Sequence, residues 1–266
     1  MGSDPVVCVT GAAGQLGRAL RPLLPAATFV DVERLDVTDR EAVRSALDGV
    51  DLVVNCAALT DVDGCEREPE RAMSVNARGA AHIAVAGPRV IQISTDYVFD
   101  GDRAGEYAED DEPNPRSVYG RSKLEGERAV LEAGPNLVVR TSWLFGDGRN
   151  FVRSVVAADR AGKQLRVVAD QRGRPTGAEA LARAVAFLAG GEAAGILHVA
   201  GDGDPCTWAE LAELAVGHPV EHVTTEEWGA PAPRPRNSVL ALDRARSLGV
   251  PLTDWRLSLR RYVEGL

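Results

Sequence analysis

The 266-residue chain is long enough for one large α/β domain, or for one such domain with a small added lobe. Its 45% hydrophobic and 26% charged residues are ordinary for a globular protein, and no apolar run approaches the roughly 18 residues that span a bilayer. The formal net charge of −9 argues against nucleic acid and against an anionic membrane surface as partners. No basic stretch precedes the first apolar run, as it would in a signal peptide, so we expect a cytoplasmic protein.

The cysteine and lysine content narrows the chemistry further. The four cysteines form no CxxC pair, which favours reduced thiols and predicts no metal site. Lys123 and Lys163 are the only lysines among 30 basic residues, so the other 28 are arginines. This bias is typical of a GC-rich, actinomycete-like genome, and it makes each retained lysine worth examining.

Short apolar runs alternate with amphipathic stretches through the first half of the chain. The runs predicted to be strands are residues 6–10, 28–32, 52–56, 90–94 and 137–141. The helical patterns between and after them begin near Leu16, Arg40, Glu68, Tyr119 and Asn150. Strands that are apolar throughout and alternate with helices predict a doubly wound α/β fold of the Rossmann type, with helices on both faces of a parallel sheet.

The second half is less regular. We expect a helix over 177–189, a strand over 195–199, a helix over 207–216 and an extended surface loop over the proline-rich segment 228–237. The Rossmann domain should therefore cover residues 1–150 and be completed by about 177–200. Residues 151–176 and 201–266 should form a small substrate-binding lobe.

A glycine-rich turn follows the first predicted strand. Gly11, Gly14 and Gly17 give the spacing GxxGxxG between that strand and the helix near Leu16. Glycines permit a tight turn and close approach of the backbone to a pyrophosphate, and the helix start adds N–H donors. The turn predicts a bound dinucleotide, NAD(H) or NADP(H).

The second strand bears on which dinucleotide is bound. It is predicted to end near Asp31, where an acidic residue normally binds the adenosine ribose and favours NAD. Arg34 is placed to reach the 2′-phosphate of NADP instead, and Asp36 and Val37 follow where an adenine edge is read. The sequence leaves the choice of cofactor open.

Tyr119 and Lys123 are spaced four apart at the start of a predicted helix and share one face. A ketone reductase must protonate the carbonyl oxygen as hydride arrives, and a free phenol, with a pKa of about 10, is a weak acid for this task. An adjacent ammonium is expected to lower that pKa. Thr95, at the end of the preceding apolar strand, supplies a hydroxyl that can bind the substrate carbonyl.

Longer motifs carry a resemblance to a known family. They are NCAALTDVD at 55–63, STDYVFDG at 94–101, YGRSKLEGE at 119–127, RTSWLF at 140–145, DQ with PTG within 170–177, and RPRNS at 234–238. With these motifs the chain resembles the extended short-chain dehydrogenase/reductases, and within them the dTDP-4-dehydrorhamnose reductase family. The resemblance runs nearly end to end.

The resemblance implies reduction of the C4 ketone of a dTDP-4-keto-6-deoxyhexose by NAD(P)H. It makes Tyr119 the general acid, Lys123 its modulator and Thr95 the carbonyl ligand. It assigns the pyrophosphate and the cofactor channel to Gly11, Gly14, Gln15, Leu16, Gly17, Ala57, Ala58 and Thr60. It makes Asn76 a support for the lysine through a hydrogen-bond relay, and it turns Asp96, Trp143 and Arg234 toward the sugar nucleotide. Taken alone, Trp143 also suits a buried core and Arg234 a solvated surface.

The chain departs from the family pattern in several places. The helix between Asn76 and the strand at 90–94 is about one turn short, and the linker before the proline-rich loop is compressed, so we expect a reduced lobe. The helix after the glycine turn lacks the glutamate that some members use in a metal-bridged dimer, so no such metal contact is predicted. A monomer and a homodimer both remain open. In an actinomycete-like chain the sugar can belong to antibiotic glycosylation rather than to rhamnose.

Two other functions remain as alternatives. A redox-neutral sugar-nucleotide epimerase or 4,6-dehydratase shares the Tyr and Lys spacing, but dehydratases resemble Thr-Asp-Glu at the strand end, where this chain has Tyr97 in the third place. A non-catalytic regulatory subunit shares the same fold. That alternative would be favoured by loss of the tyrosine or the lysine, and both are present.

Overall fold

A computed structural model describes residues 5–266, and a parallel six-stranded sheet forms its centre. In spatial order the strands are β2 (Thr28–Phe29), β1 (Val7–Thr10), β3 (Leu52–Asn55), β4 (Arg89–Thr95), β5 (Leu137–Thr141) and β10 (Gly195–His198). The chain moves outward from β1 in both directions, so the order reverses between β1 and β3, where ligand crevices form in such sheets. The doubly wound α/β fold predicted from the sequence is confirmed.

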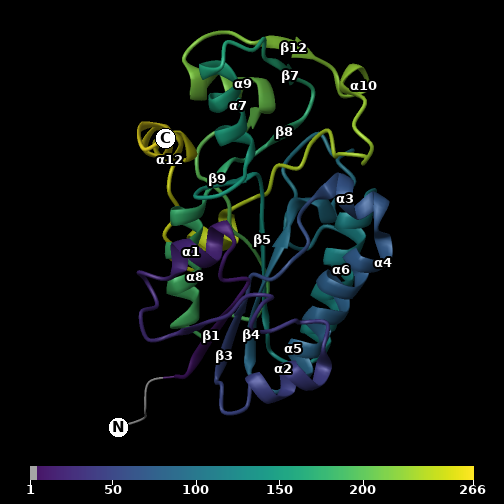
Figure 1. The fold of residues 1–266 in the computed structure, drawn as a ribbon, viewed down its shortest axis with the longest axis vertical. Coiled ribbons are helices and arrows are strands. Elements are labelled where there is room, and N and C mark those ends of the chain that lie inside the picture. Colours follow the sequence, from purple (N-terminus) through teal and green to yellow (C-terminus); the bar gives the residue numbers. More distant parts are fainter. Residues whose placement is uncertain (1–4) are drawn as a thin grey trace.

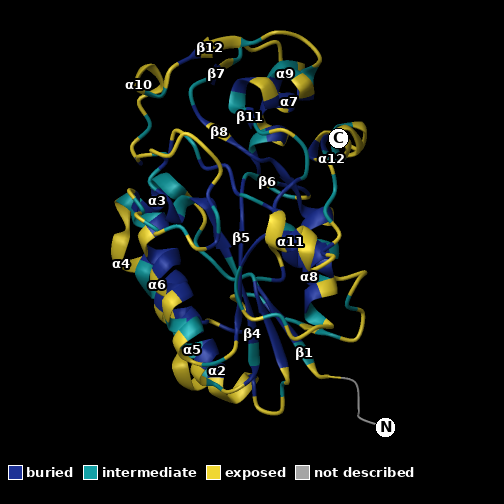
Figure 2. Cartoon of the chain, turned by 180° about the vertical axis from the view of Figure 1, so that it is seen from behind, coloured by how far each residue is buried: buried dark blue, intermediate teal, exposed yellow. Residues whose placement is uncertain are grey.

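Helices cover both faces of this sheet (Figure 1). One face is covered by α1 (Gln15–Leu20) and α8 (Ala178–Ala189), and the other by α2 (Arg40–Ala46), α5 (Gly79–Val85) and α6 (Val118–Glu132). Alternate residues of each strand enter the two cores: Val54 packs with α1 and α8, whereas Val53 packs with α2 and α5. Figure 2 shows the strands as the buried layer between helices whose outer faces are exposed.

The helical segment that ends in α5 is interrupted. It runs from α3 (Val62–Arg67) through α4 (Pro69–Ala72) and a π-helical stretch, η1 (Met73–Arg78), into α5. Helix α6 packs so closely on η1 that a side chain at Gly126 would collide with the carbonyl oxygen of Asn76. The wide π turn therefore lies beside the helix that carries Tyr119 and Lys123, and such turns are frequent at functional sites.

The lobe lies beyond the carboxyl ends of the strands, at the top of Figure 1. Its helices are α7 (Phe151–Arg160), α9 (Trp208–Val216), α10 (Thr225–Trp228) and α12 (Trp255–Glu264). Three two-stranded ladders accompany them: β6 (Leu144–Phe145) with β9 (Thr176–Gly177), β7 (Arg166–Val168) with β12 (Glu221–Val223), and β8 (Arg172–Gly173) with β11 (Cys206–Thr207). Trp255, fully buried, anchors the lobe core with Phe145 and Leu211.

The last part of the chain returns to the sheet domain. Ala245, in α11 (Asp243–Ser247), and Val250 pack in the core shared by the sheet and α8. We therefore propose that residues near 240–250 belong with the Rossmann domain, although the sequence pattern assigns all of 201–266 to the lobe.

Several predicted boundaries need correction. The strand predicted over 28–32 ends at Phe29, because the carbonyl of Val30 accepts a hydrogen bond from Ala12 in the glycine turn and the chain then bends away. The predicted loop 228–237 begins inside α10, of which Trp228 is the last residue. The short elements α3, α10, α11 and α12 were not predicted, because each is fixed by packing or capping rather than by a long apolar pattern. Among residues 5–266, no helix is long and apolar enough to cross a membrane.

Candidate active site

The glycine turn between β1 and α1 is shaped by close contacts. Gly11 has a φ of +64°, and a Cβ there would lie 2.6 Å from the backbone of Cys56 at the end of β3. A Cβ at Gly17 would lie 2.5 Å from the carbonyl oxygen of Gly11. The turn is closed by a hydrogen bond of 3.0 Å from the Gly14 nitrogen to the Gly11 oxygen. Glycine is therefore needed at positions 11 and 17 for the turn to pack closely against the end of β3 and against itself.

A cavity of about 400 Å³ joins this turn to the predicted catalytic residues. Most of the residues expected in the site line it together: Gly11, Gly14, Gln15, Leu16, Gly17, Ala58, Thr60, Thr95, Asp96, Tyr119, Lys123 and Trp143. They come from the ends of β1, β3, β4 and β5 and from the start of α6. A single cavity therefore contains the phosphate-binding turn, a proton donor and an ammonium group.

Strand β4 and helix α6 hold the catalytic side chains against each other. The Thr95 side chain lies close enough to the Tyr119 phenol to affect its pKa. The Lys123 ammonium donates to the carbonyl of Ile93 at 2.7 Å and is only 4% exposed. Ser117 caps α6 by accepting from the Gly120 nitrogen at 3.0 Å, which fixes the turn on which Tyr119 lies.

The expected lowering of the Tyr119 pKa by Lys123 is wrong for this arrangement of the chain. Burial raises the pKa of the phenol above its ordinary value, and the neighbouring Thr95 side chain opposes that rise in part. Within residues 5–266, Lys123 directs its hydrogen bond to backbone and not to the phenol. Burial lowers the pKa of Lys123 to about 8, while the Glu127 carboxylate favours the charged form.

Asp96 is a buried carboxyl group at the edge of this cavity. It is 2% exposed, and its Oδ1 accepts a hydrogen bond of 3.1 Å from the Thr95 hydroxyl. Its Oδ2 is buried and has no hydrogen-bond partner among the residues described. Burial raises the pKa of Asp96 to about 7, so this group can be neutral at physiological pH.

Asn76 lies in η1, behind the cavity. Its Oδ1 accepts from the Leu59 nitrogen at 2.7 Å, and its Nδ2 donates to the Leu59 carbonyl at 3.0 Å and to the Ser122 hydroxyl at 2.9 Å. Among residues 5–266 this side chain makes no direct hydrogen bond to Lys123, and the relay stays a prediction. Asn76 ties the loop that carries Ala58 and Thr60 to helix α6, next to the lysine.

The remaining predicted cofactor residues lie outside the lining of this cavity. Ala57 donates its nitrogen to Asn55 Oδ1 at 3.1 Å just after β3. Asp31 lies two residues beyond the shortened β2, and Asp36 is engaged with the Thr38 nitrogen and hydroxyl at 2.9 and 2.8 Å. Val37 is buried under α5. The structure therefore places these four residues along the sheet edge that continues from the glycine turn.

Two tryptophans form one wall of the cavity. The Trp143 ring stacks on the Trp208 ring with centroids 3.6 Å apart and planes 6° apart. Trp143 has a φ of +48°, a conformation that glycine favours, and Gly173 leaves the space that its ring occupies. A bulky residue in this conformation costs about 1–3 kcal/mol, and such strain clusters at functional sites. Trp143 is half-buried: it lines the cavity and also packs against the hydrophobic core of the lobe.

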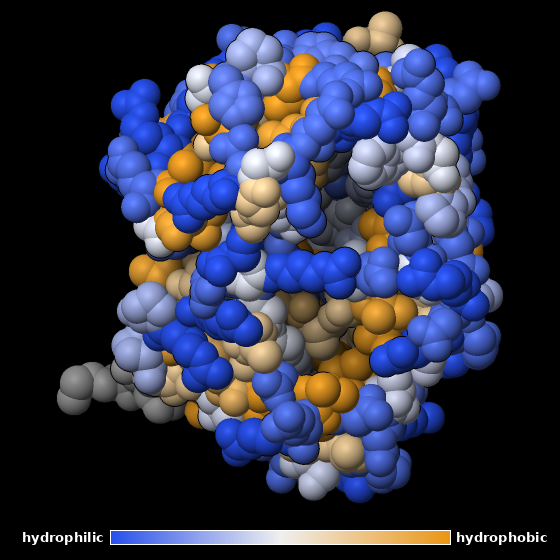
Figure 3. All heavy atoms as spheres, turned by 45° about the horizontal axis from the view of Figure 1, so that its top comes forward, coloured by the Kyte–Doolittle hydropathy of each residue, from blue (hydrophilic) through white to orange (hydrophobic). Residues whose placement is uncertain are grey.

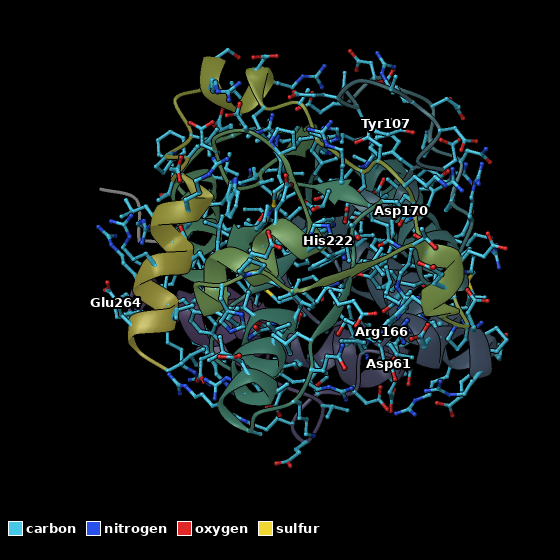
Figure 4. All side chains as sticks on the ribbon, turned by 90° about the horizontal axis from the view of Figure 1, so that it is seen from above. Asp61, Tyr107, Arg166, Asp170, His222 and Glu264 are labelled. Carbon is cyan, nitrogen blue, oxygen red and sulfur yellow. The ribbon has the colours of Figure 1, made fainter. Side chains whose placement is uncertain are left out.

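A second cavity, of about 590 Å³, adjoins the first on the lobe side. The two share Thr60, Val62, Tyr97, Arg149, Asn150, Phe151 and Trp208. Figure 3 shows a hollow on this side of the molecule, with hydrophilic side chains at its rim. Arg166 of β7 and Asp61, which caps α3, both line the second cavity and lie on the same side of the molecule in Figure 4.

Arg234 spans this second cavity from the proline-rich loop. Its guanidinium forms two hydrogen bonds to Asp63 on α3, at 3.1 and 3.0 Å, and it also bonds the phenol of Tyr97. Asp63 in turn accepts from the Ala232 nitrogen at 3.1 Å. The loop of the lobe is thus tied to the sheet domain across the cavity, and the expectation of a freely solvated Arg234 does not hold.

Comparison with known proteins agrees with this geometry. A family model described as the RmlD substrate binding domain matches residues 6–266. The chain belongs to this family. A dTDP-4-dehydrorhamnose reductase of Streptomyces griseus is 44% identical over 97% of this chain and 93% of its own length. A probable dTDP-4,6-dihydroxy-2-methyloxan-3-one 4-ketoreductase of Streptomyces antibioticus is also 44% identical, over 95% of this chain and 92% of its length.

Solved structures of the RmlD family share the fold. A dTDP-4-dehydrorhamnose reductase of Bacillus anthracis in complex with NADP superposes with a TM-score of 0.94 at 35% identity, covering 99% of this chain and 100% of its own. A dTDP-glucose 4,6-dehydratase of Streptomyces venezuelae, only 21% identical, has a TM-score of 0.83 over 97% of this chain and 95% of its own. The latter likeness concerns the fold alone.

In this member of the RmlD family, several cavity residues were missed by sequence reasoning. They are Asp63, Tyr97, Arg149, Phe151, Trp208 and Trp228. Asp63 and Tyr97 occur within the motifs quoted above, so their position in a motif was a usable signal. Trp208 and Trp228 lie on short lobe helices whose place depends on tertiary packing, and no local pattern pointed to them.

Proposed function

We propose that the chain is an NAD(P)H-dependent reductase that converts the C4 ketone of a dTDP-linked 4-keto-6-deoxyhexose to an alcohol. The single observation that carries this proposal is the 400 Å³ cavity in which the glycine turn, Thr95, Tyr119 and Lys123 meet. Relatives with 44% identity that are named as 4-keto reductases of dTDP-sugars support the substrate class.

The cofactor residues have the shape that a dinucleotide needs. Gly11, Gly14 and Gly17 line the cavity in a tight turn that only glycine permits at positions 11 and 17, and the Oε1 of Gln15 is buried without a partner among the described residues. When bound, the reduced nicotinamide supplies the hydride. Asp31 and Arg34 again leave the preference between NADH and NADPH open, although the NADP complex of the Bacillus anthracis relative favours testing NADPH first.

Proton delivery falls to the residues on β4 and α6. The Thr95 hydroxyl holds the ketone oxygen and the Tyr119 phenol near one another, and Tyr119 donates the proton as the C4 oxygen gains negative charge. In the described part of the chain, Lys123 donates to the Ile93 carbonyl and not to the phenol, so its proposed role is to bind the cofactor beside Tyr119. Solvent then returns the proton to Tyr119, which completes the balance of one hydride and one proton for each ketone reduced.

The sugar nucleotide would occupy the joined cavities. The sugar ring lies against the Trp143 and Trp208 wall beside Asp96, while Arg149, Arg166 and Arg234 face the diphosphate in the second cavity. Arg234 and Arg166 are ion-paired with Asp63 and Glu221, so we propose that the diphosphate shares or replaces these carboxylates as their partner. We further propose that the protein acts in the cytoplasm on a free small-molecule substrate, as a monomer or a homodimer.

A substrate panel tests the proposal. The purified protein is offered several dTDP-4-keto-6-deoxy sugars with NADH or NADPH, and oxidation of the nicotinamide is followed by absorbance. We expect oxidation stoichiometric with sugar, and NMR of the product would give the configuration at C4 and distinguish a rhamnose precursor from an antibiotic sugar. Conversion of the sugar without net oxidation would replace the proposal with a redox-neutral epimerase or dehydratase.

A further inference from the structure

A buried ion pair lies one helical turn beyond the catalytic lysine. Glu127 of α6 and Arg140 of β5 are each 1% exposed and are joined by hydrogen bonds of 3.0, 3.2 and 2.7 Å between guanidinium and carboxylate. Tyr119, Lys123 and Glu127 are spaced by four residues, so they share one face of α6. A buried pair of this kind contributes little net stability on average. Stability alone therefore does not explain why the pair lies beside the catalytic lysine.

Three consecutive residues of β4 hold these three side chains. The Ile93 carbonyl accepts from Lys123, the Ser94 hydroxyl donates to Glu127, and the Thr95 side chain lies beside the Tyr119 phenol. Arg140 is the register partner of Ser94 on β5. The ion pair is therefore part of the same strand-to-helix contact that orients the proton donor.

We propose that Glu127 and Arg140 are positioning residues that set the electrostatic environment of Lys123 and Tyr119 and hold both groups in place for proton transfer. This inference rests on the proposed reductase function for its catalytic meaning. The physical basis of the inference is that charges alternate along the contact between β4, β5 and α6: the Lys123 ammonium, the Glu127 carboxylate and the Arg140 guanidinium. All three are shielded from solvent, so salt and water screen their interactions weakly.

Other titratable groups among the described residues also surround this contact, and none of them adds a charge that replaces Glu127 beside Lys123. Those facing Tyr119 or Lys123 are the thiols of Cys56 and Cys65, the carboxyl groups of Glu66 and Asp96, and the phenol of Tyr97. Burial raises the pKa of the Cys56 thiol to about 12 and that of Cys65 to about 11, so both stay neutral over most of the accessible pH range. Arg78 of η1 is paired with Glu70, and His82 of α5 contacts the Val37 carbonyl, so both are directed elsewhere.

On the far side of Arg140, the neighbouring strand adds no compensating charge. His198 of β10, its register partner, is fully buried, and burial together with Arg140 lowers the pKa of this imidazole to about 3. Arg140 therefore has Glu127 as its close charged partner. Removal of one member of the pair leaves a full charge of known sign beside the lysine.

The two lysines of the chain make a direct measurement possible. Protein labelled with ¹³C at the lysine ε-carbon gives two side-chain signals, one from Lys123 and one from exposed Lys163, which serves as the internal reference. Lys123→Arg assigns them. In the unaltered protein we expect the Lys123 signal to titrate at about 8.

Single substitutions should move this titration in opposite directions. Glu127→Gln keeps the shape and the acceptor oxygen but removes the negative charge, so the Lys123 midpoint should fall by about one pH unit. Arg140→Met leaves the carboxylate unopposed, so the midpoint should rise, and by less, because Arg140 contacts Glu127 and not the lysine. The double variant Glu127→Gln with Arg140→Met should return toward the original value, and Arg140→Lys, which keeps the charge, should change it least.

Turnover gives the second measurement. The alkaline limb of the pH profile of kcat/KM should follow the same signs, whether the limb reports Lys123 or Tyr119, because added positive charge lowers the pKa of both groups. The inference would be overturned if the Lys123 midpoint moved in the same direction in both single variants. It would also be overturned if the midpoint did not move in folded Glu127→Gln. The NMR titration needs no substrate, so it remains decisive even if no dTDP-sugar is reduced and the proposed function fails.

Folding is monitored in parallel. Breaking a buried pair from one side can cost about 3–5 kcal/mol, so each variant is checked by thermal unfolding and by binding of NADP. If Arg140→Met does not fold, Glu127→Gln and the double variant still decide the question, because replacement of both members by neutral groups is often tolerated.

Discussion

The two walls of the active-site cavity are built in different ways. The sheet-domain wall consists of strand ends and the first turns of α1 and α6, where backbone hydrogen bonds and buried side chains fix Thr95, Tyr119 and Lys123. The lobe wall consists of short ladders and loops, fixed by contacts distant in sequence such as Arg234 with Asp63, 171 residues apart. This difference suggests that the first wall performs chemistry of constant geometry, whereas the second can vary with the sugar nucleotide.

Replacing the phenol should give the largest effect. Tyr119→Phe removes the proton donor while leaving the packing, so turnover should fall by roughly 10²–10⁴-fold with little change in cofactor affinity. Nicotinamide oxidation measures the first quantity and titration with NADPH the second. Tyr107→Phe is the matched control, because that phenol bonds Asp100 and the Gly101 nitrogen away from the cavity. Full turnover by Tyr119→Phe would show that Tyr119 is not the proton donor.

The two lysines provide the next comparison. Lys123→Arg keeps the positive charge but replaces a compact ammonium in a buried position with a planar, larger group, so activity should fall by about 10²-fold. Lys163→Arg, at an exposed site, should be neutral. Initial rates at saturating cofactor measure both. Equal activities would mean that any cation suffices on the sheet-domain wall.

The raised pKa of Asp96 should make the free energy of unfolding depend on pH. Its pKa is raised from 3.8 to about 7, so the native state holds a proton that the unfolded state releases between these values. The contribution to the free energy of unfolding is therefore fully present below about pH 4 and is lost as pH rises through about 7, by about 4 kcal/mol at most. Urea unfolding of Asp96→Asn at several pH values should show a variant that gains relative stability as pH rises. A difference independent of pH would contradict the raised pKa.

Substitutions in the lobe wall should have smaller effects, and these should concern substrate binding. Arg234→Ala should raise KM for the dTDP-sugar by about tenfold, equivalent to about 1.4 kcal/mol, and leave kcat and NADPH affinity nearly unchanged. Asp63→Asn should change KM less, because Arg234 stays charged and free to bind a diphosphate. A fall in kcat without a change in KM would contradict the division of labour between the walls.

The same contrast explains what the sequence could predict. The parallel sheet, the glycine turn and the meeting of Thr95, Tyr119 and Lys123 follow from strand ends that a parallel topology must bring together. The pairing of Arg234 with Asp63 and the stacking of Trp143 on Trp208 depend on how loops of the lobe pack, and no local periodicity encodes that packing. The pKa of Tyr119 was mispredicted for a related reason, because it depends on burial and on which atom the lysine actually bonds.

The stacked tryptophans have a practical consequence. The chain has four tryptophans, of which Trp143 and Trp208 line the first cavity and Trp228 the second, while Trp255 is fully buried. Two indoles held face to face at 3.6 Å should couple optically, giving a near-ultraviolet circular dichroism signal that changes when a ligand parts or covers them. The protein thus carries its own spectroscopic reporter of cavity occupancy, with Trp255 as an emitter that substrate does not touch.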